Sequence, residues 1–264
     1  MSFLKLHNIA KSFGPRRILR DIHLALAEGE FVSIVGASAS GKTTLVKIAS
    51  GLTSPDSGTV TVAGQPVQGF LGEAGMVFQN YSLLPWLSAL ENVRLAVEPA
   101  FPKWSPRQHT AQAMKYLEMV GLAKAALKTP AQLSGGMRQR VSIARAFAAE
   151  PRILFLDEPF GALDALTRAT LQQELAQLCR AAGRPVTALM ITNSVEEAIL
   201  LSDRIHALGR GPGATLSPPF DVPLSRPRSA GLLMHDAGAV SLRHRLAEFL
   251  TLGTVAPALI QEVA

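Results

Sequence analysis

One eight-residue stretch constrains this chain more than any other: GASASGKT, from Gly36 to Thr43, which matches the pattern G-x-x-x-x-G-K-[ST]. The apolar, β-branched run FVSIV precedes it, as expected of a buried parallel strand, and the helical sequence TTLVKIAS follows it. Its glycines let the backbone curl so that several N–H groups face one phosphate, and the helix adds its positive N-terminal end. The stretch therefore predicts a nucleotide-binding α/β domain.

Two side chains of this loop have expected roles. Lys42 is placed to reach the β- and γ-phosphates, and the hydroxyl of Thr43 is placed to reach Mg²⁺. A Gly/Ser-rich loop that matches the pattern by chance is the alternative, but the flanking strand and helix argue against it.

A second motif, RILFLDEP at residues 152–159, ends a predicted buried strand in two adjacent carboxylates. Successive side chains at a strand end point in different directions, so Asp157 and Glu158 can take different roles. We expect Asp157 to serve Mg²⁺ and Glu158 to polarise the attacking water. The alternative is a solvated acidic turn.

A third motif, LSGGMRQR at residues 133–140, stands just before a predicted helix. Ser134 and the two glycines would make a second phosphate-binding helix end, although the same residues could be a simple helix cap. One nucleotide does not need two such ends from one chain. A head-to-tail dimer, in which each site takes its second end from the partner, would explain both.

The order of predicted elements gives the fold class. Strands alternate with helices over most of the chain, which predicts an α/β fold with a mostly parallel sheet. Residues 1–35 alternate as β-strands and predict an N-terminal antiparallel β subdomain, whereas residues 82–150 predict an inserted helical subdomain. We place the main domain at 1–215 and a C-terminal extension at 216–264, in which Leu242, Leu246, Phe249 and Leu250 share one face of a helix. The last residues, 251–264, carry no motif and are expected to be partly disordered.

These motifs together resemble those of the ATP-binding-cassette (ABC) ATPases, a P-loop NTPase family. The resemblance rests on GASASGKTT, Gln79 in MVFQNYSLLPW, LSGGMRQR, ILFLDEP and the following ALD, in matching order over roughly residues 3–215. FGALDALTR, LLPWLSALENV and DRIHALGRGPG are similar to the ATPase subunits of bacterial importers in the nitrate/sulfonate/taurine class. The resemblance implies ATP and Mg²⁺ as cofactors, a second copy of the chain, a transmembrane permease and, indirectly, a substrate-binding protein as partners. It also implies a peripheral position at the cytoplasmic face of the inner membrane.

The resemblance further implies a role for each matching residue. The phosphates would be wrapped by Gly36, Ala37, Ser38, Ala39, Ser40, Gly41, Lys42, Thr43 and Thr44. Adenine would stack on Phe13, whose alternative is core packing, and Gln79 would contact Mg²⁺ and the lytic water, with a strand-end polar residue as its alternative. The γ-phosphate bound by the other protomer would meet Ser134, Gly135 and Gly136, and Asp164 would couple the two sites. Glu158 would be the general base.

One position departs from the family pattern. In TNSVEEA, Asn193 stands where the family has a histidine that donates a hydrogen bond to the γ-phosphate. Asparagine is shorter and cannot become cationic, although its amide could still donate. We therefore expect nucleotide binding and dimer closure with slowed hydrolysis. The alternatives are a tolerated variant or a helix N-cap, a role that Ser194 could also take.

Composition narrows the remaining classes. The net charge is +6, but the arginines are scattered and form no long run, so we do not expect a nucleic-acid partner. The single Cys179 excludes an internal disulfide and fits a reducing compartment, and neither a signal peptide nor an 18-residue apolar stretch is found. Besides the importer subunit, two readings stay open: a soluble ABC ATPase outside transport, and a weakly hydrolysing ATP-binding module with a regulatory or structural role.

Overall fold

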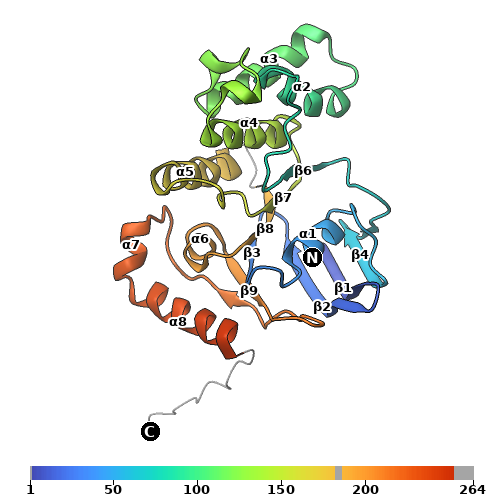
Figure 1. Ribbon diagram of the computed structural model, residues 1–264, viewed down its shortest axis with the longest axis vertical. Coiled ribbons are helices and arrows are strands. Elements are labelled where there is room, and N and C mark those ends of the chain that lie inside the picture. Colours follow the sequence, from blue (N-terminus) through green and yellow to red (C-terminus); the bar gives the residue numbers. More distant parts are fainter. Residues whose placement is uncertain (1, 182–185, 253–264) are drawn as a thin grey trace.

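The computed structural model describes residues 2–181 and 186–252. Three groups of elements surround a central sheet (Figure 1): an antiparallel sheet at the N-terminus, a group of helices inserted in the middle of the chain, and two helices near the C-terminus. The expectation for residues 251–264 falls almost entirely outside the described residues.

The central sheet has six strands in the order β10–β9–β3–β8–β7–β6. All neighbours are parallel except the edge pair β10 and β9, which confirms the predicted mostly parallel α/β fold. Every residue of the three middle strands is buried, as their mainly apolar sequences predict. The strands are β3 (Phe31–Gly36), β6 (Ala74–Val77), β7 (Ile153–Asp157), β8 (Thr187–Thr192), β9 (Arg204–Leu208) and β10 (Phe220–Asp221).

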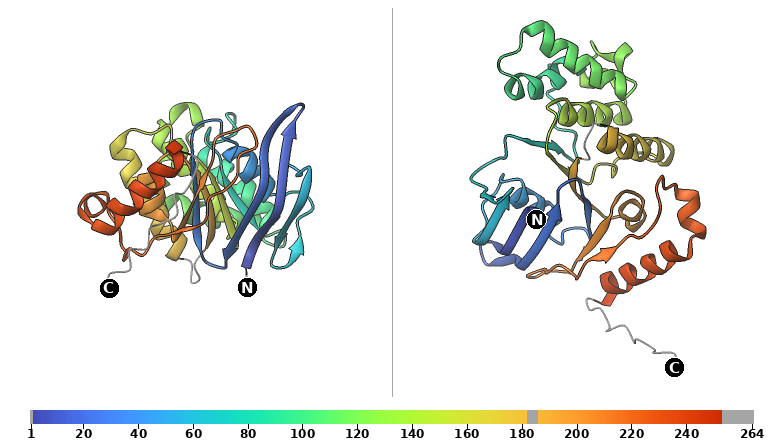
Figure 2. Two further views of the ribbon diagram at one scale, coloured as in Figure 1. Left: turned by 90° about the horizontal axis from the view of Figure 1, so that it is seen from below. Right: turned by 180° about the vertical axis from the view of Figure 1, so that it is seen from behind.

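The N-terminal sheet is antiparallel, as predicted, in the order β2–β1–β4–β5. Apolar side chains alternate along its first two strands, and their buried face packs on helix α1 (Lys42–Ala49), which follows the phosphate loop. This sheet and the C-terminal helices lie on opposite sides of the central sheet (Figure 2, left). The strands are β1 (Ser2–Phe13), β2 (Arg16–Ala27), β4 (Ser57–Val62) and β5 (Gln65–Pro66).

The inserted helices connect β6 to β7 and stand apart from the N-terminal sheet (Figures 1 and 2). Ser88 and Ser105 begin two of them with capping boxes, in which each serine hydroxyl and the residue three positions later satisfy one another's backbone N–H. Their apolar faces meet around Val93, Leu117 and Phe147. The elements are α2 (Ala89–Ala100), α3 (Pro106–Met119), η1 (Ala123–Ala125), η2 (Pro130–Gln132) and α4 (Gly135–Ala148).

The remaining helices lie on the side of the central sheet that faces away from the N-terminal sheet (Figure 2). They are α5 (Ala165–Ala181), α6 (Val195–Leu201), α7 (Ala230–His235) and α8 (Ala237–Leu252). The predicted apolar face of α8 is real, because Leu242, Leu246 and Phe249 are buried in a core shared with α6 and β9. Leu250 packs at the edge of this core. The C-terminal extension is thus joined to the main domain by continuous apolar packing.

Candidate functional site

The phosphate loop joins the end of β3 to the start of α1 and needs backbone conformations that few residues adopt. Gly41 has φ +106°, and a Cβ there would lie 2.8 Å from the side chain of Ile18. Ala39 has φ +61°, in the left-handed region that is costly for alanine. The loop is therefore held in a strained shape by its surroundings, which is common where backbone N–H groups must converge on a ligand.

Lys42 is almost fully buried, with 4% of its surface exposed. Its ammonium donates to the carbonyl oxygens of Gly36 (3.0 Å) and Ala37 (2.9 Å) and to Oδ1 of Asn193 (2.7 Å), and it lies 3.5 Å from Oε1 of Glu158. Burial lowers the pKa of Lys42, and the nearby Glu158 carboxylate partly opposes that shift. Three neutral oxygen atoms and one nearby carboxylate thus hold the ammonium in place, and an anionic phosphate can replace the two carbonyl contacts.

Asp157 ends the buried strand β7, and its Oδ1 accepts a hydrogen bond from the Thr43 hydroxyl at 3.1 Å. Burial raises the pKa of Asp157, and the hydrogen bond from Thr43 acts against this shift. A buried carboxylate and a hydroxyl in contact are hard oxygen ligands, the type that Mg²⁺ prefers alongside phosphate oxygens and water. Two of the three predicted magnesium residues, Thr43 and Asp157, therefore fit such an ion, whereas Gln79 contacts Glu158 instead. No cluster of three His, Cys, Asp or Glu suited to a metal occurs among the residues described.

Glu158 follows directly and faces a different group. Its φ of +45° turns the chain sharply after the strand, and its Oε2 lies 3.4 Å from Nε2 of Gln79, which donates to it. Gln79 is exposed and comes two residues after the end of β6. The carboxylate thus lies between Lys42 and Gln79 at the open edge of the site, where a water molecule could reach it.

Asn193 lies at the end of β8 and turns its side chain toward Lys42 rather than toward the following helix. Ser194 is the residue that caps α6, since its hydroxyl accepts a hydrogen bond from the N–H of Glu197 at 3.2 Å. Because an ammonium can only donate, the atom of Asn193 that meets Lys42 must be the amide oxygen. Its amide nitrogen has no hydrogen-bond acceptor within residues 2–181 and 186–252.

A cavity of about 240 Å³ opens over the phosphate loop. Phe13 lines it with 55% of its surface exposed, so this ring is not a core residue. Two further residues that were not predicted line the cavity, Arg16 and Ile18, which follow Phe13 across a tight turn. Their only sequence signal was their closeness to Phe13. The other lining residues are Ala39, Gly41, Lys42, Thr43, Thr44 and Glu158.

Ser134, Gly135 and Gly136 lie at the start of α4 and do not line this cavity. Within the chain Ser134 caps α4, because its hydroxyl accepts a hydrogen bond from the N–H of Met137 at 3.3 Å. Asp164 likewise lies away from the cavity and accepts a hydrogen bond from the N–H of Thr167, which lowers the pKa of its exposed carboxyl. One chain therefore brings together only the first part of the predicted site.

Arg145 of α4 was missed as well. It donates to the carbonyl oxygens of Ser82 (2.6 Å) and Tyr81 (2.9 Å), just after Gln79. Both acceptor residues have positive φ, so the contact holds a strained turn. The segment that carries Gln79 is therefore tied to the helix that begins at Ser134. No sequence pattern could have revealed this long-range contact.

The comparisons with known proteins agree with this geometry. A family model described as ABC transporter matches residues 19–161. The nitrate import ATP-binding protein of Synechococcus elongatus is 44% identical over 252 residues, which cover 94% of this chain and 91% of that protein. The bicarbonate transport ATP-binding protein of Synechocystis sp. is 43% identical over 253 residues, covering 94% and 89%. A dimeric ATP-binding cassette in a post-hydrolysis state, bound to ADP and Pi, matches with a TM-score of 0.72 and 32% identity, covering 84% of this chain and 100% of that one.

Proposed function

The chain belongs to the ABC transporter family of ATP-binding proteins and is an ATPase, and we propose that it energises the import of a small anion through a separate permease. The anion class is supported by the relatives, which are named for nitrate import and bicarbonate transport. None of the described helices is long and apolar enough to cross a bilayer, so the transport path in this proposal belongs to another protein. The ATPase would work at the cytoplasmic face of the membrane.

Nucleotide binding follows from the geometry of the phosphate loop. The phosphates take the cradle of backbone N–H groups, and Lys42 exchanges its carbonyl partners for phosphate oxygens. Phe13 lies beside the loop with an exposed ring face for adenine. Thr43 and Asp157, with Gln79 nearby, would hold Mg²⁺, which supplies charge neutralisation for the phosphates.

Glu158 would act as the general base for the attacking water. Its carboxylate lies between Gln79, which would orient the water, and Lys42, which would hold the γ-phosphate. Asp157, one residue earlier, faces Thr43 and so stays available to the ion. The water, the phosphate and the ion would thus each meet a different side chain.

A second copy of the chain would complete the site. Ser134, Gly135 and Gly136 present a helix N-terminus away from the cavity of their own chain, and such an end suits a phosphate on a partner. The matching cassette structure is dimeric, which supports this arrangement. Asp164, exposed at the start of α5, would carry the coupling between the two sites.

An apolar cavity of about 490 Å³ supports a permease as the second partner. It lies between the inserted helices and the core, and Leu52, Phe70 and Leu95 on its walls are exposed by 44%, 49% and 43%. Exposed apolar groups of this size are typical of protein interfaces. Phe78 lines the same cavity and precedes Gln79 directly, so a partner seated there would be one residue from the nucleotide site.

We further propose that Asn193 makes ATP hydrolysis slow. Its amide oxygen is committed to Lys42, which leaves only a short, neutral NH₂ group to donate to the γ-phosphate. A histidine would reach further. Loss of one preorganised donor typically lowers a rate by about 10²–10³-fold, and a partial substitute loses less.

The test is ATP hydrolysis with Mg²⁺, in single-turnover and steady-state modes, by the wild type and three variants. Glu158→Gln should lower the rate by at least about 100-fold while ATP still binds, because it removes the base. Asn193→His should raise kcat by roughly tenfold or more. Asn193→Ala is the matched control and should be slower than wild type if the amide still donates.

The outcomes separate the readings. Fast wild-type turnover that does not rise in Asn193→His would reject slow hydrolysis and leave an ordinary transport ATPase. Turnover that stays negligible even in Asn193→His would favour an ATP-binding regulatory or structural module instead. Co-purification with a membrane protein from detergent-solubilised membranes would distinguish the importer subunit from a soluble ABC ATPase.

A further inference from the structure

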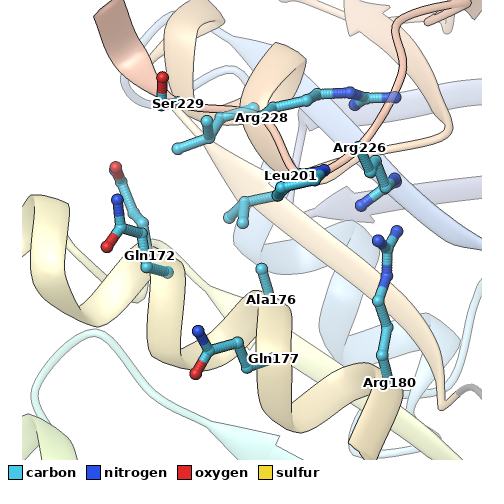
Figure 3. A pocket seen from close by; sticks show the side chains of 11 residues that line it. Gln172, Ala176, Gln177, Arg180, Leu201, Arg226, Arg228 and Ser229 are labelled. Carbon is cyan, nitrogen blue, oxygen red and sulfur yellow. The ribbon is translucent and has the colours of Figure 1, made fainter.

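Arg180 and Arg226 point toward each other across a cavity that the nucleotide site does not use (Figure 3). Arg180 is near the end of α5, and Arg226 lies in the segment that leads to α7. The cavity between α5, the end of α6 and residues 226–229 measures about 770 Å³. That volume is within the usual range for small-molecule sites, roughly 300–1,000 Å³.

The charge along this cavity is strongly positive. Three arginines line it, Arg180, Arg226 and Arg228, and none of its described lining residues is acidic. Arg226 forms an ion pair with Asp203 just outside the cavity. The group as a whole therefore holds an excess of about two positive charges, which a bound anion would neutralise.

The three arginines are not equivalent. Arg228 donates to the carbonyl oxygens of Ile199, Ser202, Val222 and Leu224, so it fixes the wall of the cavity. Arg180 has neither a hydrogen bond nor an ion pair within the described part of the chain. Partial burial and repulsion from Arg226 lower the pKa of Arg180. The unpartnered guanidinium of Arg180 thus points toward the guanidinium of Arg226, which is already paired with Asp203 (Figure 3).

The rest of the cavity is suited to an organic group. Ala176, Leu201 and Pro227 give it apolar walls beside the arginines. Gln177 also lines the cavity, and its amide can donate or accept a hydrogen bond. A ligand with one compact anionic end and an apolar body would contact both kinds of surface.

We propose that this cavity binds an organic phosphate monoester, with the phosphate held between Arg180 and Arg226 and the apolar body against Ala176, Leu201 and Pro227. The phosphate is favoured over a carboxylate because both guanidiniums converge on one point. A phosphate monoester brings close to two negative charges to that point at neutral pH, and a carboxylate brings one. Guanidinium groups also match its oxygens with paired N–H donors. The site shares no residue with the nucleotide cavity.

The test is calorimetric titration of phenyl phosphate into the full chain, with Mg–AMP-PNP present in excess to fill the phosphate loop. Benzoate and inorganic phosphate are titrated in parallel. Arg180→Gln removes the unpartnered guanidinium, and Arg107→Gln, at an exposed position of α3, is the matched control. Because Arg180 makes no hydrogen bond or ion pair to the described residues, its variant should keep the wild-type thermal unfolding temperature.

The proposal expects phenyl phosphate to bind wild type and Arg107→Gln equally, and Arg180→Gln at least about tenfold more weakly. It also expects both benzoate and inorganic phosphate to bind more weakly than phenyl phosphate. Absence of binding, or binding unchanged in Arg180→Gln, would overturn the site. If benzoate bound as tightly as phenyl phosphate, the site would not be specific for phosphate. If inorganic phosphate bound as tightly as phenyl phosphate, the apolar wall would not contribute to binding.

Discussion

Lys42 and Arg228 both bind main-chain carbonyl groups, but they differ in what they hold together. Lys42 contacts two carbonyls of its own loop and the amide of Asn193, all at the edge of an open cavity. Arg228 contacts four carbonyls from two segments and joins the end of α6 to the chain that follows β10. The same interaction thus serves two purposes.

The difference lies in what could replace the contacts. A phosphate can replace both main-chain carbonyl partners of Lys42, so these carbonyls hold the lysine in position until a nucleotide binds. The contacts of Arg228 are structural instead: two satisfy acceptors at the end of α6, and the others satisfy acceptors in the segment after β10. We therefore expect substitutions of Lys42 to affect activity, and substitutions of Arg228 to affect stability.

The largest effect should come from Lys42→Met, which keeps the length of the side chain and removes its charge. Single-turnover hydrolysis should fall by at least about 10²–10³-fold, the usual loss when one preorganised donor to a developing charge is removed. Urea unfolding of the nucleotide-free protein should change by less than about 1 kcal/mol, since burial already disfavours the ammonium. A large loss of stability in Lys42→Met would break the comparison.

Arg228→Met should have the opposite profile. Four carbonyl acceptors lose their donor, and the free energy of unfolding should fall by about 2–4 kcal/mol. Arg107→Met on the surface of α3 should change it by less than about 0.5 kcal/mol. If Arg228→Met unfolds at the wild-type urea concentration, the arginine does not stabilise the C-terminal segment.

A smaller effect on the free energy of unfolding should come from Asp157→Asn, which replaces a buried carboxylate of the nucleotide site with a neutral amide of similar size. Burial raises the pKa of Asp157, so its stabilising contribution is present below its unfolded pKa and is lost as pH rises through the folded pKa. At neutral pH the ionised carboxylate therefore destabilises the nucleotide-free protein, and the variant should be more stable by about 1 kcal/mol. This advantage should shrink as the pH is lowered toward 4, measured by urea unfolding. An advantage that does not change with pH would assign it to packing instead of charge.

Much of the fold follows from local sequence. The phosphate loop could be predicted from its own motif with the strand and helix beside it. The three middle strands could be predicted from their short, mainly apolar sequences, because parallel strands buried on both faces are rich in apolar residues. The helical insertion was equally clear, since Ser88 and Ser105 begin helices with recognisable caps.

The remaining features depend on contacts between distant residues. The six-residue α7 and the two-residue β10 are too short for any periodicity to reveal them. The resemblance to a known family indicated that Asn193 stands at an important position, but it did not indicate that the amide would bind Lys42. Arg145 and Arg228 act on main-chain carbonyls, which every residue has, so their partners leave no mark in the sequence.

The strand order of the central sheet also bears on how the protein is made. β3 pairs with β8 and β9, and Lys42 is separated from Asn193 by 151 positions in the chain. At a synthesis rate of about 5–20 residues per second, Lys42 is made roughly 8–30 seconds before Asn193. During that interval β3 is an apolar segment without its sheet neighbours. The cavity over the phosphate loop is complete only after Glu158 has been made, so a nucleotide can stabilise the full site only from that point of synthesis onward.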